Sequence, residues 1–131
     1  MKYLLDTNVF AELFRGNKAV RVAVSSAGLP NCALSEITLA ELMFGARKGG
    51  IERHRHEIEF VKNDMEILPI GPAIDIFAEL KADLRMKGIG IDNFDLLIAA
   101  TALDRDLTLV THNTRHFERI PELKLIDWEQ P

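Results

Sequence analysis

Short apolar runs alternate along the chain with longer segments in which apolar residues recur every three or four positions. Runs of strand length end at turn-forming or polar residues, which predicts β-strands. The predicted strands are "KYLL" (2–5), "NCAL" (31–34), "MEILPI" (65–70), "LTLVT" (107–111) and a short edge strand "LKLID" (123–127). Helices are predicted over 8–14, 18–27, 36–47, 51–63, 73–87 and 93–104. Strands that alternate with helices predict a three-layer α/β/α fold with a mostly parallel sheet of four to five strands.

Helix boundary signals support several of these segments. Asn17 and Ser35 are natural N-caps, and glycines follow four of the predicted helices: Gly16, Gly28, the pair Gly49 and Gly50, and Gly88. The chain has 131 residues and contains no repeat, low-complexity tract or linker. We therefore expect one domain over residues 1–131.

The composition bounds the class of protein. With 47% hydrophobic and 27% charged residues, a packed core is expected. No apolar run is long enough for a membrane span and Asp6 interrupts the N-terminus early, so we expect a cytoplasmic protein with no membrane partner. Cys32 is the single cysteine, which excludes an internal disulfide.

The net charge of −4 argues against a surface coated by nucleic acid, although one stretch is locally basic. This stretch is "RKGGIERHRH" (47–56), with four Lys or Arg residues against one Glu. It fits either a solvated loop and helix face or a local contact surface for an acidic partner.

A parallel sheet binds its ligands beyond the carboxyl ends of its strands, so acids that follow strands are the first candidates. Asp6 directly follows the first predicted strand, in "LLDTN", where it is either a turn or N-cap residue or a metal ligand. Glu41 lies two turns into "SEITLAELMFGARK", on a narrow polar strip of a helix that is otherwise mostly apolar. Such a strip either faces solvent or lines a cleft.

A third acid, Asp95, begins the apolar helix "DNFDLLIAATAL" (92–103) and shares a face with Ala99 and Ala102. With Asp92 as N-cap, Asp95 takes the third helical position, where the helix dipole is worth about 0.3 to 1 kcal/mol. Burying an unpaired charge costs several kcal/mol, which is more than the dipole supplies. We therefore expect Asp95 to reach solvent or to meet a cation.

Considered together, Asp6, Glu41 and Asp95 are expected around one edge of the sheet. Clustered carboxylates repel one another and are tolerated chiefly around a divalent cation. Oxygen ligands with open positions suit Mg²⁺ or Mn²⁺, which also accept phosphate oxygens. The sequence thus predicts phosphate chemistry by a metal-activated water. No Gly-x-Ser-x-Gly, Walker or His-Glu-x-x-His motif in the sequence indicates another mechanism.

Five segments, in order, resemble the PIN-domain ribonucleases and, within them, the VapC-type toxins of type II toxin–antitoxin systems. These are "LLDTNVF", "SEITLAELMFG", "GIDNFDLLIAATAL", "LVTHNTRHFERI" and the closing "DW". The resemblance implies a PIN-like fold in which Asp6, Glu41 and Asp95 are the catalytic and metal-binding acids. The supporting polar residues that it implies are Thr7, Asn8 and Thr111.

The resemblance breaks at the fourth acid that is common in the family, two residues after the threonine. Asn113 stands there, and His116 occupies a position before Phe117 where an acid is often found. A site with three carboxylates should bind one metal ion more readily than it binds two metal ions. Asn113 could instead hydrogen-bond a metal-bound water or a ligating carboxylate, and Asp92 is a further candidate, although its spacing equally fits an N-cap.

The resemblance also implies a function and partners. It implies an Mg²⁺- or Mn²⁺-dependent endoribonuclease toxin that cleaves structured RNA such as transfer RNA and is neutralised by a VapB-like antitoxin. A homodimer is expected, or a larger toxin–antitoxin complex that binds operator DNA through the antitoxin. The basic residues expected to contact RNA or antitoxin are Arg15, Arg47, Lys48, Arg53 and Arg115.

The sequence argues against two other phosphate-binding functions and leaves a third function open. A phosphoacceptor signalling domain would need an acid at the end of the central strand, and "MEILPIGP" ends without one. A phosphatase with an aspartyl nucleophile would need a second acid at the position of Asn8. A catalytically degenerate PIN domain that only binds RNA or protein stays open as the alternative.

Overall fold

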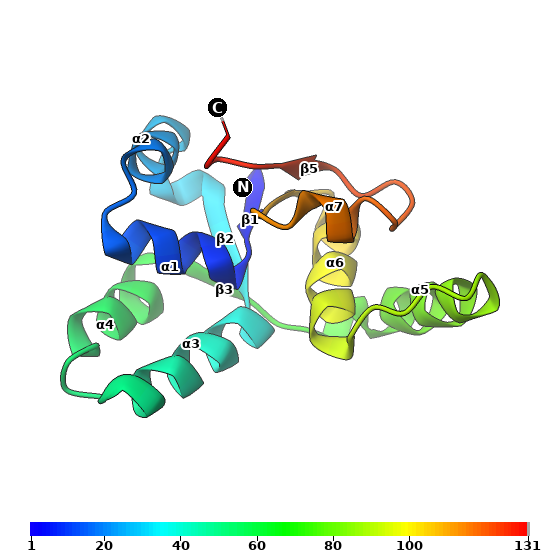
Figure 1. Ribbon diagram of the computed structural model, residues 1–131, viewed down its shortest axis with the longest axis horizontal. Coiled ribbons are helices and arrows are strands. Elements are labelled where there is room, and N and C mark those ends of the chain that lie inside the picture. The colour runs from blue at the N-terminus through cyan, green and yellow to red at the C-terminus, as the bar shows by residue number, and fades with distance from the viewer. Residues whose placement is uncertain (131) are drawn as a thin grey trace.

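The computed structural model describes residues 1–130 and has the predicted three-layer α/β/α architecture (Figure 1). Pro131, the last residue of the predicted domain, lies outside the described residues. All five strands are parallel, in the order β3-β2-β1-β4-β5. They are β1 (Tyr3–Leu5), β2 (Cys32–Ser35), β3 (Glu66–Leu68), β4 (Thr108–Val110) and β5 (Leu125–Ile126). The predicted fold class is confirmed.

The six predicted helices are present, with small differences at their ends. They are α1 (Thr7–Arg15), α2 (Lys18–Ala27), α3 (Glu36–Gly49), α4 (Arg55–Asp64), α5 (Ile74–Met86) and α6 (Asn93–Arg105). The prediction began α4 at residue 51, but turns follow Gly50, whose φ of 103° breaks the helical path. A four-residue helix, α7 (Thr114–Phe117), was not predicted, because it is too short to show helical periodicity.

The four strands β1 to β4 contribute to two cores because successive side chains point to opposite faces. Leu4 and Leu109 pack on one face with α6, and Leu5 and Val110 pack on the other with α1 and α2. Figure 1 shows α5, α6 and α7 on one side of the sheet and α1, α2 and α4 on the other. Burial of both faces explains why these strands are continuous apolar runs in the sequence.

Two predicted N-caps fix the starts of α3 and α6, the helices that carry Glu41 and Asp95. Ser35 Oγ accepts a hydrogen bond from the Ile37 N–H at 3.0 Å, and Asp92 Oδ1 accepts one from the Asp95 N–H at 2.9 Å. The apolar body of α6 is buried from Leu96 onward, as expected, so this helix is anchored in the core. Only the start of α6 reaches the edge of the sheet.

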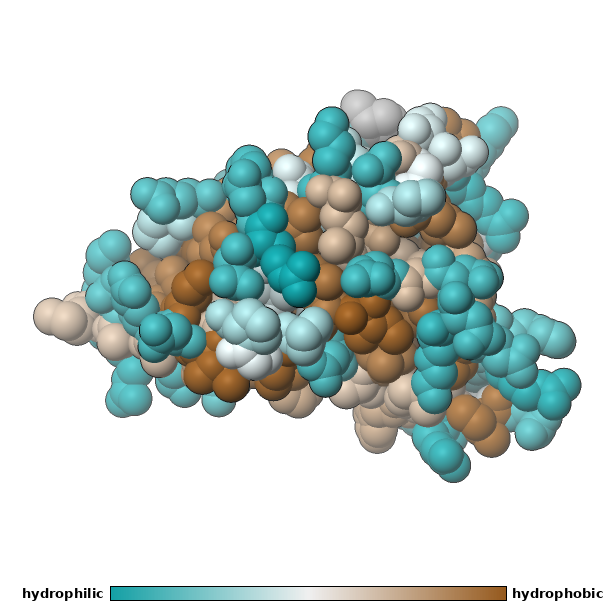
Figure 2. Space-filling model, turned by 180° about the vertical axis from the view of Figure 1, so that it is seen from behind, coloured by the Kyte–Doolittle hydropathy of each residue, from teal (hydrophilic) through white to brown (hydrophobic). Residues whose placement is uncertain are grey.

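The surface is mixed. Figure 2 shows hydrophilic side chains spread over the face behind that of Figure 1, with apolar side chains between them. In residues 1–130 no helix combines the length and apolarity that a membrane span requires.

The strand order fixes where a ligand would bind. From β1 the chain goes to β2 and β3 on one side, and the later strands β4 and β5 lie on the other side. In open α/β sheets the crevice forms where the order switches, at the carboxyl ends of the strands. Here that point lies between the ends of β1 and β4, next to Asp6 and Thr111.

Candidate metal centre

Asp6 is the buried centre of the site. It follows β1, caps α1 through a 2.8 Å hydrogen bond from the Thr7 N–H to its Oδ1, and is only 5% exposed. The sequence left open whether Asp6 was a cap or a site residue, and the cap geometry is confirmed. Burial raises the pKa of Asp6 above its ordinary value, and hydrogen bonds from Thr111 and Thr7 partly offset that rise.

Polar side chains from the start of α1 and from the residue after β4 hold the second oxygen of Asp6. Thr111 Oγ1 donates to Asp6 Oδ2 at 2.9 Å, and the Asn8 side-chain amide donates to the same oxygen at 3.3 Å. Asn8 Oδ1 accepts from the His112 N–H at 3.1 Å, and Thr111 Oγ1 accepts from the Asn113 N–H at 3.0 Å. The structure thus brings Thr111 and Asn8 together around Asp6, whereas Asn113 contributes its backbone to this network.

Glu41 reaches the site through Thr7. The Thr7 hydroxyl donates to Glu41 Oε1 at 2.6 Å and lies 3.4 Å from the hydroxyl oxygen of Thr38, which is fully buried. Thr7 also binds Asp6 through its backbone, so one residue links the acids of α1 and α3. The polar strip predicted on α3 therefore faces the inside of the site at Thr38 and Glu41, and Thr38 is a site residue that the sequence analysis did not single out.

Asp95 lies at the start of α6 with its side chain 25% exposed. Burial raises the pKa of Asp95 to about 6, and the negative charges of Asp92 and Asp6 add to the rise. Mutual repulsion of this kind means that Asp6 and Asp95 share one electrostatic environment. Keeping Asp95 charged in this environment costs free energy. A bound cation would offset that cost, as expected from the sequence.

Asp92 has the N-cap role that its spacing allowed. Its side chain is exposed, and its charge raises the pKa of both Asp6 and Asp95. Asp92 is therefore a fourth carboxylate close to the site.

The donor set fits a hard divalent cation. Asp6, Glu41 and Asp95 offer only carboxylate oxygens, and Mg²⁺ and Mn²⁺ prefer oxygen ligands. Within residues 1–130, Glu41 Oε2 and Asp95 Oδ1 accept no hydrogen bond, so each retains an oxygen for a ligand. A cation held by these oxygens would also offset the repulsion that raises the pKa of Asp95.

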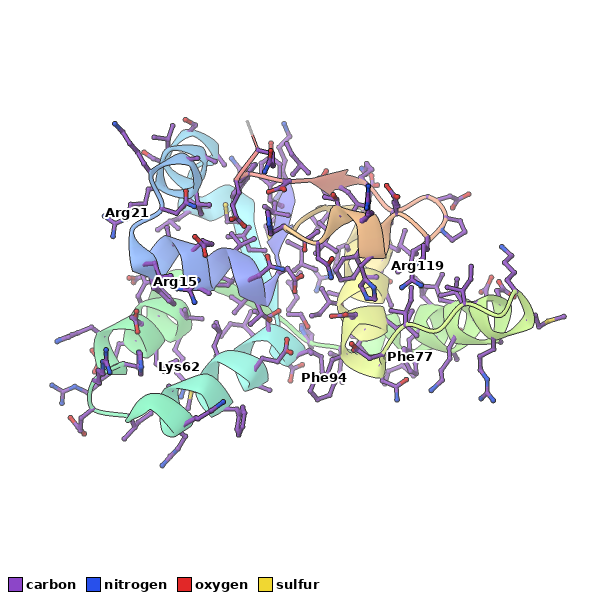
Figure 3. The ribbon with its side chains drawn as sticks, in the orientation of Figure 1. Arg15, Arg21, Lys62, Phe77, Phe94 and Arg119 are labelled. Atoms are coloured by element: carbon purple, nitrogen blue, oxygen red, sulfur yellow. The ribbon has the colours of Figure 1, made fainter. Side chains whose placement is uncertain are left out.

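Two residues that the sequence analysis did not assign to the site complete it. His116 Nε2 lies 2.9 Å from Asp95 Oδ2, and Arg119 Nη2 lies 2.8 Å from His116 Nδ1. Figure 3 shows Arg119 beside α7 and α6, and Phe94 at the start of α6 near α3. In the sequence, His116 stood at a position where the family often has an acid, but Arg119, two residues beyond α7, had no signal of its own.

A groove opens from the Glu41 side of the site and runs between α1, α3 and α4. Its volume is about 680 Å³, and it is lined by Thr7, Glu41, Phe14, Arg15, Arg53 and His54, among others. Of the five basic residues named from the sequence, Arg15 and Arg53 line this groove. The exposed side chains of Arg47, Lys48 and Arg115 are not part of its lining.

A second cluster ties the C-terminal segment to β4. His112 Nδ1 lies 3.1 Å from Asp127 Oδ2 and 3.2 Å from Glu129 Oε2, and the three ligand atoms lie within 4.8 Å of one another. Between the two acids, Trp128 packs edge-on against Tyr3 of β1 with ring centroids 5.1 Å apart. The contacts of His112 with the two carboxylates account for this cluster, which fastens the "DW" segment beside the site.

Comparisons with known proteins agree with this geometry. The family model described as PIN domain matches residues 3–123. Ribonuclease VapC2 of Rickettsia felis is 34% identical over 136 residues, which cover 99% of this chain and 100% of that protein. The tRNA(fMet)-specific endonuclease VapC of Shigella flexneri is 32% identical over 130 residues, which cover 98% of each protein.

Solved structures give the same result. The toxin–antitoxin complex VapBC of Salmonella typhimurium bound to DNA contains a chain that superposes with a TM-score of 0.90 at 32% identity, over 98% of both chains. A chain of VapBC2 of Rickettsia felis, bound to a DNA fragment from its promoter, gives 0.89 at 32% identity over 98% of this chain and 99% of that one. The chain therefore belongs to the PIN-domain family, among its VapC-type members.

Proposed function

We propose that this protein is the toxin of a toxin–antitoxin pair and acts as an endoribonuclease that depends on Mg²⁺ or Mn²⁺. The proximity of Asp6 and Asp95 at the switch point of the sheet, with the pKa values of both raised, carries this proposal. Thr7 links Asp6 to Glu41. In residues 1–130 the ligand atoms of these three acids are not all within 4.8 Å of one another, so a bound cation would have to draw them together. Relatives that are named ribonucleases support the type of reaction. A relative named as a tRNA(fMet)-specific endonuclease supports structured RNA, transfer RNA above all, as the substrate class.

The residues of the site have two kinds of role in hydrolysis: some would bind the cation, and others orient the binding residues. Asp6, Glu41 and Asp95 would hold the cation, which when bound activates water and neutralises charge on the phosphate. Thr111 and Asn8 orient Asp6, and Thr7 orients Glu41, so two of the three carboxylates are fixed before substrate arrives. Thr7 occupies Glu41 Oε1, so Glu41 Oε2 is the oxygen that would bind the cation.

The groove beside the site would receive the RNA backbone. Arg15 and Arg53 lie along it and can pair with phosphates, although Glu41 and Glu57 also line the groove and Arg15 is paired with Glu12 at 2.7 Å. An RNA path along this groove leads past Thr7 to Glu41. Because the salt dependence of binding scales with the number of phosphates that are neutralised, binding through these two arginines alone should weaken only modestly with salt.

A VapB-like antitoxin is the proposed partner. The structural relatives from Salmonella typhimurium and Rickettsia felis are VapBC complexes bound to DNA, which supports a complex that reaches operator DNA through the antitoxin. A homodimer of this chain is part of the same proposal.

Cleavage of total cellular RNA by the purified, EDTA-treated protein, with and without Mg²⁺ or Mn²⁺, tests the function. We expect cleavage only with metal, and at least a 100-fold loss in Asp6→Asn and Asp95→Asn. Asp104→Asn is the matched control, because Asp104 is an exposed acid at the opposite end of α6. Folded wild-type protein that binds metal and RNA without cleaving would favour the alternative of a binding module.

A further inference from the structure

Arg119, His116 and Asp95 form a chain of contacts that ends on a proposed metal ligand. Arg119 makes two contacts with His116, from Nε to the backbone oxygen at 3.0 Å and from Nη2 to Nδ1 at 2.8 Å. His116 Nε2 then lies 2.9 Å from Asp95 Oδ2. The His116 side chain is 23% exposed, and its ring meets Phe117 edge-on at 5.2 Å between centroids, so it is held on several sides.

The chemistry of Arg119 decides the state of the imidazole. A guanidinium can donate hydrogen bonds but cannot accept them. His116 Nδ1 must therefore be the acceptor of the 2.8 Å contact and carries no proton. Nε2 is then the nitrogen that carries the ring proton facing Asp95, and it donates to Asp95 Oδ2.

We propose that His116, set in this tautomer by Arg119, is a positioning residue that holds Asp95 Oδ2 and leaves Asp95 Oδ1 free for the cation. The inference rests on the proposed metal site. An acid in place of His116 could contribute a further anionic ligand. An Nε2–H donor does the opposite, because it brings no negative charge and takes one oxygen of Asp95 out of competition for the metal.

This role predicts an effect on metal affinity that does not depend on cleavage. Partners that orient metal-binding side chains typically contribute 10- to 100-fold to metal affinity. We expect His116→Ala to weaken Mn²⁺ binding by at least tenfold. His116→Gln should bind within about threefold of the wild type, since its amide N–H can replace Nε2–H as the donor to Asp95.

The first experiment measures the tautomer in the metal-free protein. Long-range ¹H–¹⁵N correlation spectra of the labelled protein at pH 7.5 distinguish Nε2–H from Nδ1–H and from the charged ring. The chain has four histidines, and the signals lost in His116→Gln identify those of His116. We expect Nε2–H in the wild type, and a mixture of tautomers in Arg119→Met. Arg115→Met, which removes the same charge from α7, should leave the spectrum of His116 unchanged.

The second experiment titrates Mn²⁺ into the same proteins and follows binding by electron paramagnetic resonance. Tenfold weaker binding by His116→Ala with recovery in His116→Gln supports the inference. Wild-type affinity in a folded His116→Ala protein, or a Nδ1–H or charged ring in the wild type, overturns it. Absence of Mn²⁺ binding by the wild type would overturn the proposed function as well, whereas binding by the wild type and by His116→Ala alike overturns only the role of His116.

Discussion

Asp95 should destabilise the metal-free protein, and its replacement by Asn should therefore stabilise it. In the folded chain the pKa of Asp95 is raised from 3.8 to about 6 by burial and by the charges of Asp92 and Asp6. Between these two values the folded state binds more protons than the unfolded state, so stability falls as the pH rises. The penalty is complete above about pH 6 and is lost as the pH falls below the unfolded value.

The size of the effect follows from the same values. At about 1.4 kcal/mol per tenfold change in proton affinity, the rise corresponds to about 3 kcal/mol. Asp95→Asn removes this cost but also loses about 0.3 to 1 kcal/mol of interaction between the charge and the helix dipole. We expect a net gain of about 2 kcal/mol at pH 7.5 and a rise in Tm of about 5–10 °C. Below about pH 4 the two proteins should differ by less than about 1 kcal/mol.

Guanidinium unfolding of EDTA-treated protein, followed by circular dichroism at pH 7.5 and pH 4, measures this difference. The control Asp104→Asn removes an exposed acid from the other end of α6 and should change stability by less than about 0.5 kcal/mol at either pH. Adding Mn²⁺ at about 100 times its Kd should stabilise the wild type by about 2.7 kcal/mol and the Asn variant far less. A stabilisation that is equal at both pH values, or below about 1 kcal/mol at pH 7.5, would refute the reasoning.

Three further substitutions probe the frame around the site. Thr111→Val removes the hydroxyl that donates to Asp6 and accepts from the Asn113 N–H, so RNA cleavage should fall at least tenfold and the free energy of unfolding by about 1–3 kcal/mol. Ser35→Ala removes the buried cap of α3 and should cost about 1 kcal/mol in chemical unfolding; no loss would show that the cap bond is dispensable. Phe10→Ala empties a fully buried position and should cost about 3–5 kcal/mol, with a loss below about 1 kcal/mol contradicting the packing described.

The fold could be predicted from the sequence because two patterns are strong: apolar residues that recur every three or four positions in the helices, and short apolar runs in the strands. Leu4 and Leu5 lie in an apolar run that predicts a strand buried on both faces, and they do pack into opposite cores. Caps at Asn17, Ser35 and Asp92 are side chains that bind their own helix start, so a local pattern is enough to find them.

The site could be predicted only as far as the topology allowed. Acids after strands pointed to the edge of the sheet, but the link from Thr7 to Glu41 depends on how α3 packs against α1. The contact between His116 and Asp95 joins residues 21 positions apart, and no local pattern encodes such a contact. Long-range side-chain contacts of this kind follow from tertiary packing, which explains why the sequence missed them.

The central claim is that Asp6, Glu41 and Asp95 together hold one divalent cation. Anomalous diffraction from crystals of this protein soaked in Mn²⁺ tests it most directly, because the metal is located without reference to activity. We predict one Mn²⁺ peak in contact with carboxylate oxygens of Asp6, Glu41 and Asp95. A saturated crystal with no peak there, or with Mn²⁺ confined to the His112, Asp127 and Glu129 cluster, would contradict the account.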